Sequence, residues 1–471
     1  MTSRNLVVIL SDEHQARALG CARHPFVRTP NLDALAARGT RFTNCVTPSP
    51  ICVPARAAFA TGKYPHQIGL WDNAMPYTGA PKSWGHALQD AGVACTSIGK
   101  LHYRDAGDDV GFDEQIAPMH VAHGVGMVWA SIRDEADRIR PKSRMLGNYI
   151  GPGNSNYTEY DASITQLTCD WLRRPRDNPF CLYVGLVAPH FPLVVPKRFY
   201  DLYATQDLGP MKLRPEDGYA RHPWIERQND NMNSDANFKD AAERHAARVA
   251  YYGLCTWLDH NVGQILDTLV EAGLADDTTV IYSSDHGDNV GARGLWGKSN
   301  FYQESVAVPL IVAQPGQQAN TSDTPVSLLD VSATITDHFG AGEMLGEGRS
   351  LYALAQEDTP NRIQFSEYHA AGAVSGGFML RKGRWKLNYY VGFSPELFDL
   401  QSDPEELTDL ADDPEHAETL AKLEAELRAI CDPEEVDARA FADQAALIER
   451  HGGREAALKL GAPGATPPPK V

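Results

Sequence analysis

The hydrophobic pattern over residues 1–355 alternates between two kinds of segment. One is a short, continuous run of apolar and β-branched residues, which is typical of a strand buried on both faces of a parallel sheet. The other has apolar residues three or four positions apart, which indicates a helix with one buried face. Strands are predicted at residues 5–10, 40–45, 93–98, 180–187, 278–284 and 308–312, and helices at residues 29–39, 83–91, 160–174, 239–272 and 327–339. The alternation predicts an α/β domain around a mostly parallel sheet.

The pattern changes after residue 355. Residues 378–387 form two short strand-like runs about a Lys-Gly turn, which predicts a small antiparallel sheet, and an Ala- and Glu-rich helix ends near residue 430. We therefore predict a catalytic α/β domain at residues 1–355, a small α+β subdomain at residues 356–430 and a C-terminal extension at residues 431–471. Residues 105–157 and 200–237 show no sustained period and are predicted to be loops over the surface, where substrate specificity usually resides.

The composition limits the kinds of binding partner and the cellular compartment that we expect. The 471 residues are 43% hydrophobic and 22% charged, as in ordinary globular proteins. A net charge of −18 argues against nucleic acid or an anionic membrane surface as a partner. No apolar run has membrane-spanning length, and the first strand begins too early for a leader peptide. The 8 cysteines follow no paired-spacing motif, so we expect reduced thiols and a cytoplasmic protein.

One cysteine has unusual surroundings. Cys52 lies between Pro50 and Pro54, which restrict the backbone, and small helix-compatible residues follow at 55–61. A helix that starts around Pro54 would place Cys52 just before its N-terminus, where negative charge is favoured. Arg56 adds a permanent cation with donors for a tetrahedral oxyanion. This pattern indicates a nucleophile for an anionic substrate, although a lone cysteine is also a common small buried residue.

Two pairs of metal-ligating side chains follow predicted strands. Asp12 and Glu13 come after the first strand, and Asp285 and His286 come after the strand at residues 278–284. Open α/β sheets bind ligands at the carboxyl ends of their strands, and carboxylates with an imidazole suit a divalent cation. Each pair alone is also compatible with a solvated loop or a helix cap. Together they favour a metal site.

The segment from Cys52 to Arg56, continued by Thr61 and Gly62, resembles the signature of the type I sulfatases, and the resemblance continues through further motifs to about residue 404. It implies an alkaline-phosphatase-like α/β sandwich. In that family the cysteine is oxidised to formylglycine by a maturation enzyme, and the hydrated aldehyde is the nucleophile. The Asp285-His286 form is similar to that of the choline-sulfatase-like and phosphonate monoester hydrolase branch.

The resemblance also implies the site residues. The catalytic set is Cys52, Arg56, Lys100, His102, His190 and Lys298, and the metal ligands are Asp12, Glu13, Cys52, Asp285 and His286. Arg56, Lys100 and Lys298 would offset charge on the ester oxygens. His190 or Lys298 would protonate the leaving alcohol, and His102 would take a proton from the second hydroxyl of the hydrate.

The function expected from these residues is metal-dependent hydrolysis of an organic sulfate ester through formylglycine made from Cys52. A phosphonate monoester or phosphodiester hydrolase with the same machinery is the alternative, and we expect promiscuity between them. An inert anion-binding protein and an enzyme that uses the Cys52 thiolate directly are hypotheses from other classes. The ion is expected to be Mn²⁺ or Ca²⁺, with His286 favouring Mn²⁺.

The C-terminal extension predicts self-association. It resembles the extension of choline-sulfatase-like enzymes, which makes oligomer contacts there, so we expect a homo-oligomer, either a dimer or a tetramer. Its terminal segment lacks the aromatic pattern of those enzymes, so the resemblance does not carry choline over as the alcohol of the substrate.

Overall fold

The computed structural model describes residues 3–133, 146–231, 233–342, 346–460 and 465–471. An eight-stranded sheet forms its centre, in the order β11-β2-β10-β9-β1-β7-β4-β5. The run from β9 to β5 is parallel, and β10 is antiparallel to both of its neighbours. The strands are β1 (Asn5–Asp12), β2 (Thr40–Phe42), β4 (Ala94–Lys100), β5 (Glu114–Met119), β7 (Phe180–Pro189), β9 (Thr278–Ser284), β10 (Leu310–Ala313) and β11 (Asn320–Ser322). The predicted mostly parallel sheet is confirmed.

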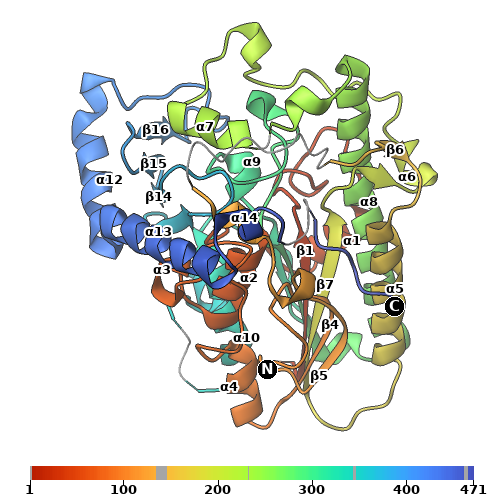
Figure 1. Ribbon diagram of the computed structural model, residues 1–471. Helices are drawn as coiled ribbons and strands as arrows, with labels where there is room; N and C mark the ends of the chain where they lie inside the picture. The colour runs from red at the N-terminus through yellow and green to blue at the C-terminus, as the bar shows by residue number, and fades with distance from the viewer. Residues whose placement is uncertain (1–2, 134–145, 232, 343–345, 461–464) are drawn as a thin grey trace.

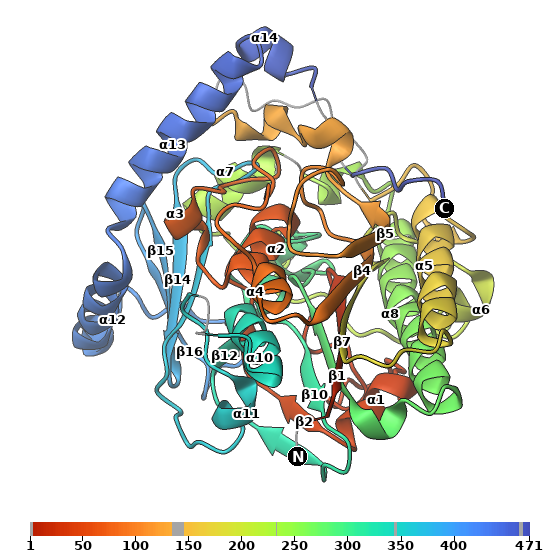
Figure 2. The ribbon, with the colours of Figure 1, turned by 90° about the horizontal axis from the view of Figure 1, so that it is seen from below.

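Helices cover both faces of this sheet (Figure 2). One face carries α1 (Pro30–Ala36), α5 (Asn156–Leu172) and α8 (Ala241–Glu271), and the other carries α2 (Cys52–Thr61), α4 (Trp84–Asp90) and α10 (Leu328–Phe339). Side chains of β1 alternate between the two cores: Val7 and Ile9 pack in one, and Val8 packs in the other. This arrangement explains why the central strand is a continuous apolar run.

A smaller antiparallel sheet lies beside the main domain (Figure 1). Its strands are β13 (Gln364–Tyr368), β14 (Gly377–Lys382), β15 (Trp385–Tyr390) and β16 (Glu396–Asp399), paired in that order. The helix α12 (Ala417–Ile430) packs against it, and α13 (Pro433–Arg450) and α14 (Arg454–Ala457) follow. The small sheet and the helical tail are confirmed, while the domain boundaries at residues 355 and 430 stay a prediction.

The helix α13 is bound to the body of its own chain. Arg133 forms an ion pair with Asp437 and donates a hydrogen bond to Gln444. Gln444 in turn donates to the carboxylate of Asp72 and to the carbonyl of His369. These contacts are intramolecular, so the predicted oligomer stays a prediction.

A buried carboxylate joins the short helix α3 (Pro65–Ile68) to the small sheet. Glu367 of β13 is fully buried and lies 2.8 Å from His66 Nδ1 and 2.9 Å from His369 Nε2. Burial opposes its charge, but the two histidines lower the pKa of Glu367 to about 2. Burial likewise opposes a charged His66, but Glu367 raises the His66 pKa above its ordinary value. The pair is therefore held as an ion pair near pH 6.

Two regions differ from the prediction. The stretch at residues 105–157 is not wholly loop, because it contains the edge strand β5, whose residues are mostly half-buried and show no clean alternation. The stretch at residues 200–237 contains α7 (Pro223–Asn231), and Trp224 of that helix is fully buried. The remaining short elements are β3 (Cys45–Val46), β6 (Gly151–Pro152), β8 (Val194–Val195), α6 (Lys197–Tyr200), α9 (Gln303–Val306), β12 (Val326–Ser327) and α11 (Leu351–Leu354).

Helices long and apolar enough to cross a membrane are absent from the part of the chain that the structure describes.

Candidate active site

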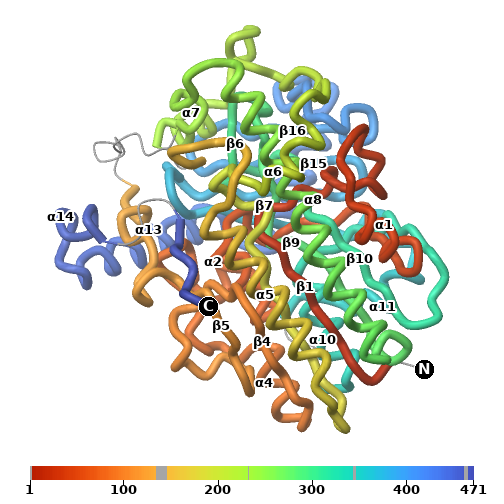
Figure 3. The backbone as a smooth tube through the Cα atoms, turned by 90° about the vertical axis from the view of Figure 1, so that its right-hand side faces the viewer, coloured from red at the N-terminus to blue at the C-terminus, as the bar shows by residue number. Residues whose placement is uncertain are grey.

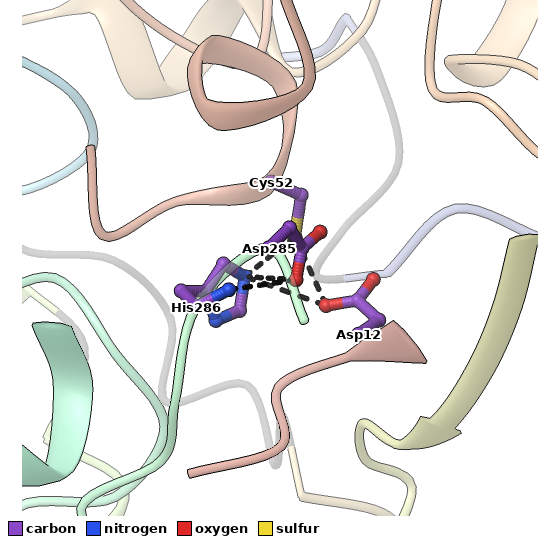
Figure 4. Close-up of side chains that lie close together, drawn as sticks. All are labelled: Asp12, Cys52, Asp285 and His286. Atoms are coloured by element: carbon purple, nitrogen blue, oxygen red, sulfur yellow. Dashed lines mark hydrogen bonds and ion pairs between the residues drawn. The ribbon is translucent and has the colours of Figure 1, made fainter. Parts of the chain in front are cut away.

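Neighbouring strands bring the first metal-ligating group together. Ser11 of β1 pairs with Ser284 of β9, so the next residues, Asp12 at the end of β1 and Asp285 just after β9, lie side by side. The first turn of α2 brings Cys52 to the same place (Figure 4). Ligand atoms of Asp12, Cys52, Asp285 and His286 all lie within 4.8 Å of one another. All four residues are buried.

The imidazole of His286 is oriented toward this group. Its Nδ1 lies 3.1 Å from the carbonyl oxygen of Gly287, which assigns the proton to Nδ1 and leaves the lone pair on Nε2. Nε2 lies 3.1 Å from Cys52 Sγ, 3.3 Å from Asp12 Oδ1 and 3.6 Å from Asp285 Oδ1. Three electron-rich ligand atoms thus converge with a sulfur in a buried space.

The chemistry of these donors fits a divalent cation. Two carboxylate oxygens and an imidazole lone pair that face one another at such distances repel one another unless a positive charge lies between them. A backbone carbonyl that fixes the tautomer of a histidine is the usual support of a metal ligand. Asp12, Asp285, His286 and the side chain at position 52 are therefore the residues that would hold the ion.

The helix α2 begins two residues earlier than the sequence predicts. Cys52 is its first residue, and Pro54 occupies the third position, where the missing N–H costs no hydrogen bond. The N–H of Val53 donates to the side-chain oxygen of Asn73 at 3.2 Å. Burial raises the pKa of the Cys52 thiol to about 12, and the nearby Asp12 carboxylate adds to this effect. The unmodified thiol is thus a poor nucleophile near neutral pH.

Arg56 is engaged by the protein itself. Its Nε donates to Asp285 Oδ2 at 2.7 Å, its Nη1 donates to the carbonyl of Lys100 and to the hydroxyl of Tyr183, and its Nη2 donates to the carbonyl of Ser11. The sequence predicted two donors directed at an oxyanion. The structure instead shows a buried guanidinium that orients Asp285 and ties together the ends of three strands.

Lys100 contacts the carboxylate of Asp12, which also belongs to the metal-ligating group. Its Nζ forms an ion pair with Asp12, and both side chains are buried. Burial raises the pKa of Asp12, but Lys100 and the neighbouring histidines and Lys298 outweigh it, so the pKa is well below its ordinary value. Gly99 and Gly185 face each other beneath Lys100, and a Cβ on Gly99 would lie 2.3 Å from the carbonyl oxygen of Gly185. This close approach fixes where Lys100 leaves its strand.

Glu13 belongs to a second group beside the first. Its carboxylate oxygen Oε2 lies 2.9 Å from Lys298 Nζ and 3.3 Å from His190 Nε2, and ligand atoms of Asp12, Glu13 and His190 lie within 4.8 Å of one another. Glu13 was predicted to share the ion with Asp285 and His286, and the structure places it in this neighbouring group instead. Burial raises its pKa well above the ordinary value.

The Nε2 atom of His190 faces a carboxylate oxygen of Glu13 across 3.3 Å in this second group. The Nδ1 of His190 lies 2.6 Å from the carbonyl oxygen of Phe191, which assigns its proton to that bond and leaves the lone pair on Nε2. A lone pair that faces a carboxylate oxygen is stable only with a proton or a cation between them. The raised pKa of Glu13 agrees with a proton held there. Burial opposes the charge of Lys298, but Cys52, Glu13 and Asp12 raise its pKa.

His102 has a partner that the sequence did not indicate. Its Nε2 lies 2.9 Å from the hydroxyl oxygen of Thr466, near the end of the chain, and its buried Nδ1 has no hydrogen-bond partner in the described structure. The hydroxyl of Tyr157 donates to the carbonyl of Thr466 at 2.5 Å. Burial, followed by the Lys100 charge, lowers the pKa of His102 well below its ordinary value, so the ring is neutral. Its backbone φ of 58° places a non-glycine residue in the left-handed region.

A polar cavity opens next to Lys298. Its wall includes Phe191, Trp296 and Lys298 together with the amide side chains of α7. Two of these amides, Asn229 and Asn231, are more than nine-tenths buried. The Asn229 nitrogen and the Asn231 oxygen have no hydrogen-bond partner in the described structure. Unpaired amide groups of this kind are suited to bind the polar part of a ligand.

The structure thus brings all ten predicted site residues to the carboxyl ends of the central strands. Seven of them form two adjoining groups that share Asp12. Arg56 and Lys100 pair with carboxylates of the first group, and the His102 ring contacts Thr466. Their individual roles stay predictions. The sequence reasoning missed Tyr157, Thr466, Asn229 and Asn231. None of these four residues has a motif around it, and each is recognised only by its unpaired or short contacts in the folded chain.

Comparison with known proteins agrees with this geometry. The family described as Sulfatase matches residues 4–341, and the family described as N-sulphoglucosamine sulphohydrolase, C-terminal, matches residues 291–432. The choline-sulfatase of Rhizobium meliloti (strain 1021) is 33% identical over 424 residues, which cover 86% of this chain and 81% of that protein. Arylsulfatase K of Bos taurus is 29% identical over 478 residues, covering 92% of this chain and 83% of that protein.

Two solved structures have a similar fold. The phosphonate monoester hydrolase of Agrobacterium radiobacter superposes with a TM-score of 0.74 at 24% identity, covering 93% of this chain and 96% of that chain. A protein solved in complex with its substrate D-glucosamine-2-N,6-O-disulfate superposes with a TM-score of 0.71 at 21% identity, covering 94% and 99%. At these identities the likeness concerns the fold alone.

Proposed function

This chain belongs to the sulfatase family, and on that premise we propose that it hydrolyses an organic sulfate ester with a divalent ion and a formylglycine made from Cys52. The observation that carries the proposal is the convergence of Asp12, Cys52, Asp285 and His286 within 4.8 Å. The formylglycine would supply a hydrated aldehyde as nucleophile, and the ion would polarise the ester and lower the pKa of the nucleophile's hydroxyl.

The residues around this group have separate tasks. Lys100 and Lys298 place two positive charges beside the buried carboxylates, where a tetrahedral anion would otherwise be repelled. Arg56 forms an ion pair with Asp285 and so would hold this ligand in place. Preorganised charges in a dry site stabilise the developing charge on the ester oxygens without reorganisation.

Two proton-transfer groups flank the reacting centre. A proton held between Glu13 and His190 would lie next to Lys298, and His190 would deliver it to the leaving alcohol. The neutral ring of His102 would accept a proton at Nδ1 when sulfate is expelled. The cavity beside Lys298 would take the alcohol part of the ester.

A phosphonate monoester or phosphodiester is the second candidate substrate. The fold likeness to a phosphonate monoester hydrolase favours it, and so does a site that recognises a tetrahedral anion more than its central atom. Direct thiolate catalysis without a bound cation is disfavoured, because burial raises the pKa of the Cys52 thiol to about 12.

The test begins with the enzyme co-produced with a formylglycine-generating enzyme and supplied with Mn²⁺. We expect kcat/KM for 4-nitrophenyl sulfate to exceed that for a phenylphosphonate monoester, and the peptide that contains residue 52 to have the mass of formylglycine. Cys52→Ala should lower kcat by a factor on the order of 10⁴ or more, as removal of a nucleophile does. Cys21→Ala, at a half-buried cysteine outside the site, is the matched control.

Each outcome has a clear meaning. A preference for the phosphonate ester would move the enzyme to the second candidate. Full turnover by Cys52→Ala would exclude every mechanism in which this residue is the nucleophile. Full turnover by protein whose residue 52 is still cysteine would restore the thiolate hypothesis.

A further inference from the structure

The last described residues of the chain run along the candidate active site. The chain ends beside α5 in all three views (Figures 1, 2 and 3). Ala465 packs on the main hydrophobic core, and Thr466 and Pro468 are half-buried, whereas Pro467 and residues 469–471 are exposed. The segment is therefore attached to the body of the protein around Thr466.

Thr466 uses both of its polar groups at the site. Its hydroxyl oxygen lies 2.9 Å from His102 Nε2, and its carbonyl accepts the hydroxyl of Tyr157 at 2.5 Å. Tyr157 also packs edge-on against the ring of His190, with 5.7 Å between ring centroids. Through these contacts the segment touches one of the two proton-transfer histidines directly and the other through one aromatic ring.

A neutral histidine has one N–H and one lone pair, and its hydrogen bonds decide which nitrogen has which. Among the described residues, the only hydrogen-bond partner of the His102 ring is the Thr466 hydroxyl at Nε2. A half-buried hydroxyl can accept the Nε2–H with its oxygen and give its own hydrogen to water. The buried Nδ1 would then hold the lone pair.

We propose that Thr466 is a positioning residue of this active site, whose hydroxyl accepts the Nε2–H of His102 and so keeps Nδ1 free to take a proton. The role of His102 as a proton acceptor rests on the proposed function. The contact between Thr466 and His102 does not depend on it. The principle is that of a base oriented by a third group, here supplied by the C-terminal segment. Tyr157 fixes the backbone of the segment, so the hydroxyl stays in register with the ring.

The matched pair of variants is Thr466→Val, which keeps the shape and removes the hydroxyl, and Thr466→Ser, which keeps the hydroxyl. Thr466→Val should lower kcat about tenfold with little change in KM, because orientation of the base is lost and substrate contacts are not. Thr466→Ser should restore kcat to within about twofold of the wild type. Lys470→Ala, at an exposed position of the same segment, is the control.

A second readout is independent of turnover. Long-range ¹H–¹⁵N correlation spectra of protein labelled at histidine report the tautomer of each ring, and His102→Gln assigns the signal. We expect the Nε2-protonated tautomer in the wild type and in Thr466→Ser, and a mixture of tautomers in Thr466→Val. The thermal unfolding midpoint of Thr466→Val should stay close to that of the wild type, which separates positioning from folding.

Wild-type kcat for Thr466→Val, or an Nδ1-protonated His102 in the wild type, would overturn the proposal. If the wild type hydrolyses neither ester but shows the expected tautomer and its loss in Thr466→Val, the proposed function fails and the positioning contact stands. The two failures are therefore distinguishable.

Discussion

The Nε2 atom of His286 lies 3.1 Å from the sulfur of Cys52, although 234 residues separate them in the chain. The contact joins the first turn of α2 to the second residue after β9. It brings the proposed nucleophile into the group that would hold the ion. The proposed chemistry of Cys52 and that of the metal therefore depend on one another.

Removal of the metal should be visible in stability as well as in activity. Protein treated with a chelator and then given Mn²⁺ or Ca²⁺ at about a hundredfold excess over the dissociation constant should gain ~2.7 kcal/mol of stability. Asp285→Asn should lose most of this metal-dependent rise in Tm, because a carboxylate ligand is gone. Asp90→Asn, at an exposed carboxylate, is the control. An equal rise in Asp285→Asn and wild type would place the ion elsewhere.

Lys298 should matter for the chemical step. Its ammonium group contacts Glu13 and faces the cavity, so Lys298→Ala should lower kcat/KM for an aryl sulfate by about 10²–10³, the value of one preorganised charge. Steady-state kinetics beside the exposed control Lys197→Ala tests this. A loss below about twofold would remove Lys298 from the reaction.

The amides of α7 should discriminate between alcohols. Asn229→Leu removes a buried donor from the cavity wall, so KM for a sulfate ester of a polyhydroxylated alcohol should rise about tenfold. KM for an aryl sulfate, which offers no hydroxyl to that amide, should change little. Asn320→Leu, on the exposed edge strand, is the control. Equal effects on both substrates would mean that Asn229 supports the fold and not the alcohol.

The His66–Glu367 pair predicts a pH dependence of stability away from the active site. Because the folded pKa of His66 is raised, its contribution is full below its unfolded value near 6.5 and disappears as the pH rises through the folded value. Glu367 contributes above its unfolded value of 4.5, and this contribution is lost as the pH falls toward 2. His66→Gln should therefore cost about 1 kcal/mol at about pH 5.5 and less at about pH 9.

Urea unfolding at both pH values measures this difference, with His245→Gln at an exposed position as the control. A cost of His66→Gln that is the same at both pH values would show that the ring only packs there and carries no charge.

The sequence reasoning succeeded where function follows local chemistry. Asp12 and Asp285 were placed correctly because each follows a continuous apolar run, and strands of that kind are neighbours in a parallel sheet. The same logic placed His190 after β7 and Lys100 at the end of β4.

The sequence reasoning failed where residues far apart in the chain make contact, and where a strand lacks the usual apolar pattern. The strand β5 is half-exposed and contains Pro118, so it has no clean period. The partners of Arg56 are mostly backbone carbonyls and a tyrosine hydroxyl, which no motif announces. Thr466 and His102 are 364 residues apart, and a proline-rich end gives no signal that it is attached.

The two edge strands of the main sheet affect how copies of this protein can associate. The edge strand β11 is three residues long, with Asn320 and Thr321 exposed, and the opposite edge strand β5 carries Pro118, which has no N–H to offer. Long, regular edges recruit strands from other molecules and seed aggregates, whereas short polar or proline-containing edges resist it. The edges of the main sheet are therefore protected against strand pairing with other copies of the chain in concentrated solution.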